Sequence, residues 1–153
     1  MLLIAAIIEF MGGLADLPIL LGDLSQIPGP GLGGAIIIAK IALQPLLALA
    51  ALFFLIRGHL TYSLLAMAFI ILMTWLNYLP SVALHGLGSE AGGVGALFTF
   101  LLILLPPFLV VAIAGLALTG KQLTLATLLA IVPTLVSVLS VIAFAIGVGI
   151  YGF

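Results

Sequence analysis

The sequence predicts an all-α fold, a single integral membrane domain over residues 1–153 built as a polytopic transmembrane bundle of five helices. Hydrophobic residues make up 66% of the chain and charged residues 5%, against about 45–50% and about 25% in an ordinary soluble domain. Because so few charged side chains cannot cover the surface of a globule of this size in water, we expect that surface to face lipid. The apolar runs are continuous rather than alternating, and each is about twice as long as a barrel strand requires, which favours helices over strands.

Five segments are long enough to cross about 30 Å of hydrocarbon at about 1.5 Å per residue. They are residues 1–21, 35–56, 60–84, 94–118 and 123–151. The first differs from the others because it carries Glu9 and Asp16, and each ionised carboxylate at mid-depth opposes insertion by about 2.5–3.5 kcal/mol. Its many Leu and Ile residues offset much of that cost. Pro18 leaves open whether this helix spans fully, since the residue before a proline is biased away from helical geometry.

The connections between these segments predict the orientation of the chain. Two are long and rich in Gly, residues 22–34 and 85–93, and two are tight turns, residues 57–59 and 119–122. Arg57 and Lys121 fall in the two tight turns, which lie on one side of the membrane if all five segments cross. Basic residues favour the cytoplasmic side, so we expect the N terminus inside and the C terminus outside. The expected location is a bacterial-type inner membrane, with multiple passes.

Polar residues on the first three segments are expected to form one intramembrane cluster. Glu9 and Asp16 are seven residues apart and share a helix face, while Lys40 and Gln44 are four apart and share another. Asp16 and Lys40 each lie about 7.5 Å from the helix end at the first loop, so they sit level. Glu9, at about 18 Å, and Gln44, at about 13.5 Å, need a tilt or a water to meet. Asn77 lies in the same half of the membrane, about 10 Å below its helix end.

This predicted cluster admits three interpretations. In the first, Asp16 and Lys40 form one buried ion pair that lets two costly side chains insert and fixes the packing of two helices. In the second, Glu9 carries a proton during a transport cycle, because burial disfavours a charged carboxyl. In the third, Glu9 faces a partner subunit and is satisfied across an interface.

The remaining features carry little chemistry. The adjacent Pro106 and Pro107 interrupt helical hydrogen bonding in the fourth segment, and they are either a candidate hinge or a device that shapes the bundle. We find no nucleophile with a base and no zinc motif, so we expect no catalytic residues. The chain has no cysteine, and His59 and His85 lie at opposite helix ends, about 39 Å apart, so we expect no metal site and no cofactor. Three basic residues are too few to bind nucleic acid.

Two function classes follow from the sequence. The first is a non-catalytic subunit or assembly element of a membrane complex, whose polar groups are all paired and whose outer apolar faces bind other proteins or lipids. The expected partners of the chain are membrane lipids together with either other membrane subunits or further copies of itself. The second is a small proton-coupled transporter or channel in which Glu9 and Asp16 line a polar cavity. The first is favoured, because a substrate path normally needs more polar lining than one cluster supplies.

Overall fold

The computed structural model of the chain confirms the predicted all-helical class. It describes the backbone of residues 1–22, 32–85 and 92–151, and the side chains of residues 1–22, 33–79, 100, 101 and 103–150. Five helices account for nearly all of these residues: α1 (Leu2–Leu21), α2 (Leu32–Ile56), α3 (Leu60–His85), α4 (Gly92–Thr119) and α5 (Leu123–Tyr151). Helix α2 begins three residues earlier than expected, at Leu32 rather than residue 35, and α4 two residues earlier, at Gly92 rather than residue 94.

Length and composition qualify four of the helices as membrane spans. These are α1, α2, α3 and α5, and the described apolar stretch of α4 is the shorter Ile103–Thr119. Helix α1 continues through Pro18 to Leu21, so the proline does not end the helix. The N–H of Gly22 closes its last turn by donating to the carbonyl of Pro18 at 3.1 Å.

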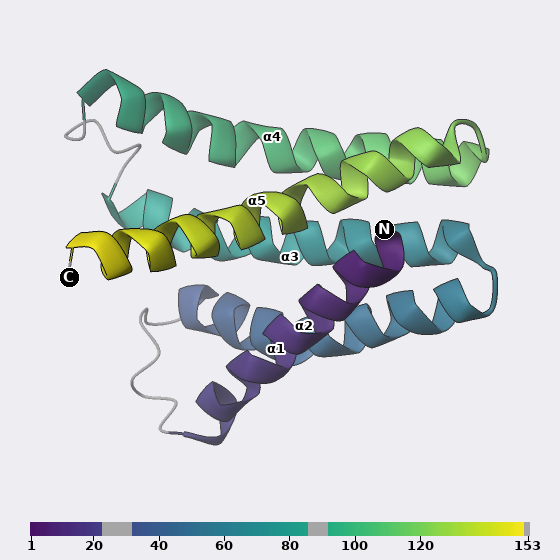
Figure 1. Cartoon of the computed structure of the whole chain (residues 1–153), viewed down its shortest axis with the longest axis horizontal. Helices are drawn as coiled ribbons and strands as arrows, with labels where there is room; N and C mark the ends of the chain where they lie inside the picture. The colour runs from purple at the N-terminus through teal and green to yellow at the C-terminus, as the bar shows by residue number, and fades with distance from the viewer. Residues whose placement is uncertain (23–31, 86–91, 152–153) are drawn as a thin grey trace.

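Glycines with positive φ form the two tight turns. Gly58 has φ +76°, its N–H donates to the Leu55 carbonyl, and the N–H of His59 donates to the Phe54 carbonyl. This pair of bonds is a Schellman motif, which needs a left-handed residue after the helix and therefore favours glycine. Gly120 follows α4 with φ +65°, and its N–H donates to the Ala117 carbonyl at 3.3 Å. Both turns lie at the same end of the bundle (Figure 1).

The helices form two layers (Figure 1). Helices α2, α3 and α4 run side by side, each packed against the next, and α1 and α5 lie across one face of this layer. Helix α5 contacts α4, α3 and also α1, which brings the first and the last helix of the chain into contact. Helix α1 is visibly inclined to α2, whereas in the row of α2, α3 and α4 each helix runs nearly antiparallel to the next. The fold therefore places one face of α1 against both α2 and α5.

Small side chains form much of the core. Eight of its fifteen buried residues are alanine, and the others are Leu, Ile or Met. Alanine lets helix backbones approach closely, which is how membrane helices gain packing energy without a hydrophobic force between them. The core draws on the half of each helix that lies next to the two tight turns, from Leu2 in α1 to Ile131 in α5. The charged residues of α1 and α2, Glu9, Asp16 and Lys40, lie beyond this core, toward the other end.

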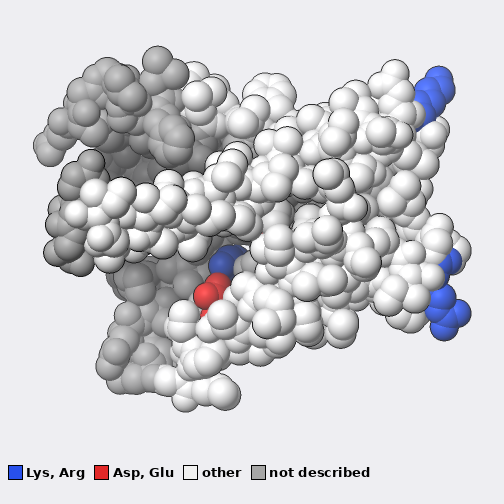
Figure 2. Space-filling model, viewed as in Figure 1, with Lys and Arg blue, Asp and Glu red and all other residues white. Residues whose placement is uncertain are grey.

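Outside the core, the surface is apolar. Phe144, Val111 and Leu118 are each at least 70% exposed, and Figure 2 shows an uncharged surface over most of the molecule. Charged side chains gather at one end, with a second group in a recess nearer the other. This surface fits hydrocarbon rather than water, so the chain is a multi-pass integral membrane protein in its architecture.

Candidate functional site

Asp16 of α1 and Lys40 of α2 lie together, at the common depth that the sequence predicts. The Lys40 ammonium donates to Asp16 Oδ2 at 3.1 Å. The side chains retain 17% exposure at Lys40 and 38% at Asp16, so the pair is open on one side. Each charge has a counter-charge at contact distance, which removes much of the cost of placing either one in hydrocarbon.

Glu9 and Gln44 meet directly, although their depths differ by about 4.5 Å when counted along the helices. The Gln44 amide donates from Nε2 to Glu9 Oε2 at 3.0 Å. The inclination of α1 to α2 in Figure 1 accounts for the meeting, since a tilted helix changes depth more slowly along its length. Gln44 is 8% exposed, and its Oε1 is a buried acceptor with no hydrogen-bond partner in the described part of the chain.

Thr134 of α5 is a member of the site that the sequence analysis did not include. Its hydroxyl donates to Glu9 Oε1 at 2.8 Å, and the side chain is 3% exposed. Both oxygens of Glu9 therefore accept a hydrogen bond, one from α2 and one from α5. The carboxyl group of a single residue therefore links the first two helices of the chain to the last.

A close backbone crossing lies between the two polar contacts of α1. A Cβ atom added to Gly13 would lie 2.9 Å from the backbone nitrogen of Pro45 and 3.0 Å from its Cδ. Real Cβ atoms essentially never come that close, so only glycine fits here without a shift of the helices. Asp16 and Glu9 lie on either side of Gly13 along α1. The crossing and the two polar contacts therefore form one continuous α1–α2 interface, which small-residue contacts typically build in membranes.

Asn77 of α3, which counting along the sequence places at the depth of these residues, makes no hydrogen bond to them among the contacts that the structure describes. Its Oδ1 atom is buried and has no partner there. The site that the described contacts build consists of Glu9, Asp16, Lys40, Gln44 and Thr134, which we call the interhelical polar site.

The proline pair of α4 is held by α3. Helix α4 continues through Pro106 and Pro107, and the Trp75 indole N–H donates to the carbonyl of Ile103 at 2.8 Å. Ile103 is four residues before Pro107, so its carbonyl is the one that the missing proline N–H would otherwise have served. A side chain from the neighbouring helix takes over this bond, as membrane proteins require where no water is present. A hinge at this position remains a prediction.

These contacts define what the interhelical polar site can do chemically. A carboxylate, an amide and a hydroxyl hold three helices together, and an ammonium–carboxylate pair reinforces two of them. Within the described ranges, no three His, Asp or Glu side chains come together as a metal site would require. Comparisons of the chain with protein-family models, curated proteins and solved structures gave no match.

Proposed function

We propose that this chain is a non-catalytic subunit or assembly element of a complex in a bacterial-type inner membrane. The observation that carries the proposal is that both intramembrane carboxylates have partners inside the chain, Asp16 with Lys40 and Glu9 with Gln44 and Thr134. Polar side chains that are engaged in contacts between helices stabilise one arrangement of those helices. A carrier, in contrast, needs polar side chains that are free to exchange their ligand. A scaffold of this kind contacts its partners through its outer faces.

Helix α5 supplies a broad apolar face for such contacts. From Leu135 to Ile150 its large hydrophobic side chains are exposed, among them Leu139 at 63% and Phe144 at 73%. Either lipid or the transmembrane helices of other subunits satisfy a face of this composition. A small protein made mostly of such faces suits an assembly role.

The test is the composition of the particle released from native membranes by a mild detergent, before any overexpression. The proposal expects other polypeptides to co-purify in a fixed ratio that survives a second, orthogonal separation. Release of the chain alone, or only with further copies of itself, contradicts the subunit role. If other polypeptides co-purify, a substitution on the surface of the chain that leaves its helicity unchanged but removes a partner would locate the contact with that partner.

The second candidate function is a small proton-coupled transporter or channel, and one observation favours it. The Oε1 atom of Gln44 is a buried acceptor without a partner in the described residues, next to Glu9. After rotation of the amide, a protonated Glu9 has an acceptor for its O–H, so the site accommodates the carboxyl in both protonation states. Proteoliposomes with a pH gradient test this function: a carrier loses turnover in Glu9→Gln, whereas a scaffold tolerates the near-isosteric amide and shows no flux to lose.

A further inference from the structure

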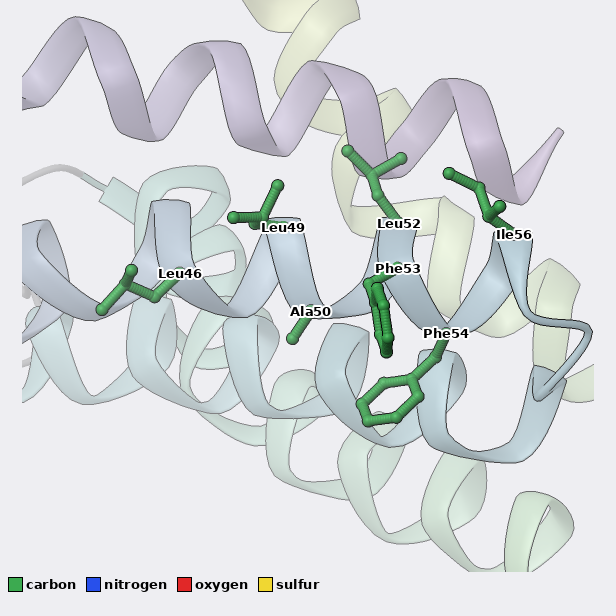
Figure 3. Close-up of a pocket in the computed structure, with 7 residues that line it drawn as sticks. All are labelled: Leu46, Leu49, Ala50, Leu52, Phe53, Phe54 and Ile56. Carbon is green, nitrogen blue, oxygen red and sulfur yellow. The ribbon is translucent and has the colours of Figure 1, made fainter.

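A shallow groove runs along the outer face of α2 (Figure 3). Seven side chains line it, all of them apolar and all between Leu46 and Ile56. Leu46, Leu49, Phe53 and Ile56 follow the spacing of one helix face and are exposed to 61%, 52%, 52% and 80%. All four side chains keep more than half of their surface exposed, so the walls of the groove are suited to hydrocarbon.

The length of the groove matches one leaflet of a bilayer. Leu46 and Ile56 are ten residues apart, which is about 15 Å along a helix. The hydrocarbon core of a bilayer is about 30 Å thick. The groove therefore extends from the membrane surface at the α2–α3 turn to about the middle of the bilayer, the depth that a single acyl chain occupies.

A positive charge is held at the polar end of the groove. The guanidinium carbon of Arg57 lies 5.3 Å from the centroid of the Phe53 ring, and this ring also lines the groove. The cation–π contact places the charge above the wall of the groove. Arg57 is exposed, and no carboxylate lies within salt-bridge distance of it among the described residues. Its hydrogen-bonding capacity is therefore open to a ligand.

Aromatic side chains mark the headgroup depth beside Arg57. The rings of Tyr62 and Phe54 lie 5.3 Å apart and those of Tyr62 and His59 lie 6.0 Å apart. Tyrosine is enriched where a membrane meets water, because its ring and its hydroxyl prefer different surroundings. Lys121, in the other tight turn, adds a second basic residue at the same end of the bundle, where Figure 2 shows exposed Lys and Arg side chains.

We propose that this groove is a binding site for an anionic phospholipid. One acyl chain lies along Leu46, Leu49 and Phe53, and the phosphate contacts the guanidinium of Arg57, whose planar donors match phosphate oxygens. An anionic lipid is preferred to a zwitterionic one because Arg57 has no carboxylate partner among the described residues, and a cationic headgroup would face this unneutralised positive charge. The described acidic residues, Glu9 and Asp16, lie in the polar site, away from this end of the groove. Basic pockets between membrane helices bind acidic headgroups by the same forces.

The experiment compares phosphatidylglycerol with phosphatidylcholine of identical acyl chains, titrated onto the full chain in detergent micelles and counted by native mass spectrometry. We expect phosphatidylglycerol to bind more tightly at one site. Arg57→Gln should weaken that binding about fivefold, the equivalent of about 1 kcal/mol for one basic residue at a membrane surface. Phe53→Leu, which keeps an apolar groove but removes the ring under Arg57, should weaken it by a smaller factor.

Lys121→Gln is the matched control, because it removes one positive charge at the same end without touching the groove. Its phosphatidylglycerol binding should stay within twofold of the unchanged chain. Equal binding of the two lipids, or equal losses in Arg57→Gln and Lys121→Gln, overturns the proposal in favour of a diffuse electrostatic effect. All three substituted side chains are exposed or at a turn, and unchanged helicity by circular dichroism verifies that each variant is folded.

Discussion

Gly13 offers the sharpest test of the α1–α2 interface, because its neighbour Gly12 provides a matched control. A methyl group in Gly13→Ala would lie 2.9 Å from Pro45 N, 3.0 Å from Pro45 Cδ and 3.1 Å from Pro45 Cα. Ordinary van der Waals contact begins at 3.4 Å, so the helices must move apart by about 0.5 Å or more. Two of the three atoms belong to the backbone, so no flexible side chain can yield.

The expected cost follows from overpacking. Inserting a methyl group into a filled contact lowers the free energy of unfolding by about 1–3 kcal/mol. Replacing glycine by alanine within a helix raises it by about 0.5–1 kcal/mol, because alanine has the higher helix propensity. Gly12→Ala has the helix-propensity contribution but no overpacking, because nothing lies within 4 Å of its added Cβ. The propensity contribution cancels in the comparison, so Gly13→Ala should be about 1–3 kcal/mol less stable than Gly12→Ala.

Equilibrium unfolding in mixed micelles of mild detergent and dodecyl sulfate, followed by circular dichroism, measures this difference. Both variants should unfold cooperatively, with the Gly13→Ala midpoint at the lower dodecyl sulfate fraction. Equal midpoints would refute the close crossing of α1 and α2 at Pro45. A loss of stability in both variants alike would show that the two glycines are needed for a reason other than this contact.

Two further predictions concern pairs of residues. Lys40→Met leaves Asp16 without its counter-charge and should lower the thermal stability of the purified protein. The double replacement Asp16→Leu with Lys40→Met should recover much of that loss. Unchanged thermal stability in Lys40→Met alone is incompatible with the ion pair. Trp75→Phe leaves the Ile103 carbonyl unserved and should destabilise by about 1–2 kcal/mol, but much less when Pro107→Ala restores the helix's own N–H. Equal effects in both backgrounds would mean that the indole bond does not compensate for the proline.

Continuous apolar runs carried most of the information about the fold. Membrane thickness fixes the minimum length of a span, so runs of this length leave little freedom in where a helix begins, and the observed helix ends differ from the expected ones by at most three residues. The end of α1 was the one helix end that the apolar run did not decide. At Leu17 the bias of a residue before proline away from helical geometry competes with continued helical hydrogen bonding. In α1 the helix prevails through to Leu21.

The site was less accessible from sequence, because depth and helix face do not identify which helices are neighbours. Counting along α1 and α2 places Asp16 and Lys40 level, and these consecutive helices pack against each other. The sequence did not predict a role for Thr134, because α5 is distant from α1 and α2 in the chain. The signal that would have found it is depth, since Thr134 and Glu9 both lie near the middle of their helices.

Asn77 shows the converse error of depth counting. It has the right depth and a polar side chain, yet the described contacts do not join it to Glu9, Asp16, Lys40 or Gln44, and its Oδ1 is left without a partner there. Helix α3 packs between α2 and α4, on the layer that α1 crosses. Equal depth counted along the sequence is therefore not sufficient to predict contact across a bundle.

The contact between Glu9 and Thr134 tests the central claim most directly, because it joins the first helix to the last. A double-mutant cycle with Glu9→Leu and Thr134→Val, measured by the same micellar unfolding, should give a coupling of about 0.5–1.5 kcal/mol, the range found for polar contacts between membrane helices. Thr127→Val is the control, because the Thr127 hydroxyl donates within α5 to the Leu123 carbonyl and should be additive with Glu9→Leu. A coupling between Glu9 and Thr134 no larger than that of the control would contradict the claim that the carboxyl of Glu9 holds α1 and α5 together.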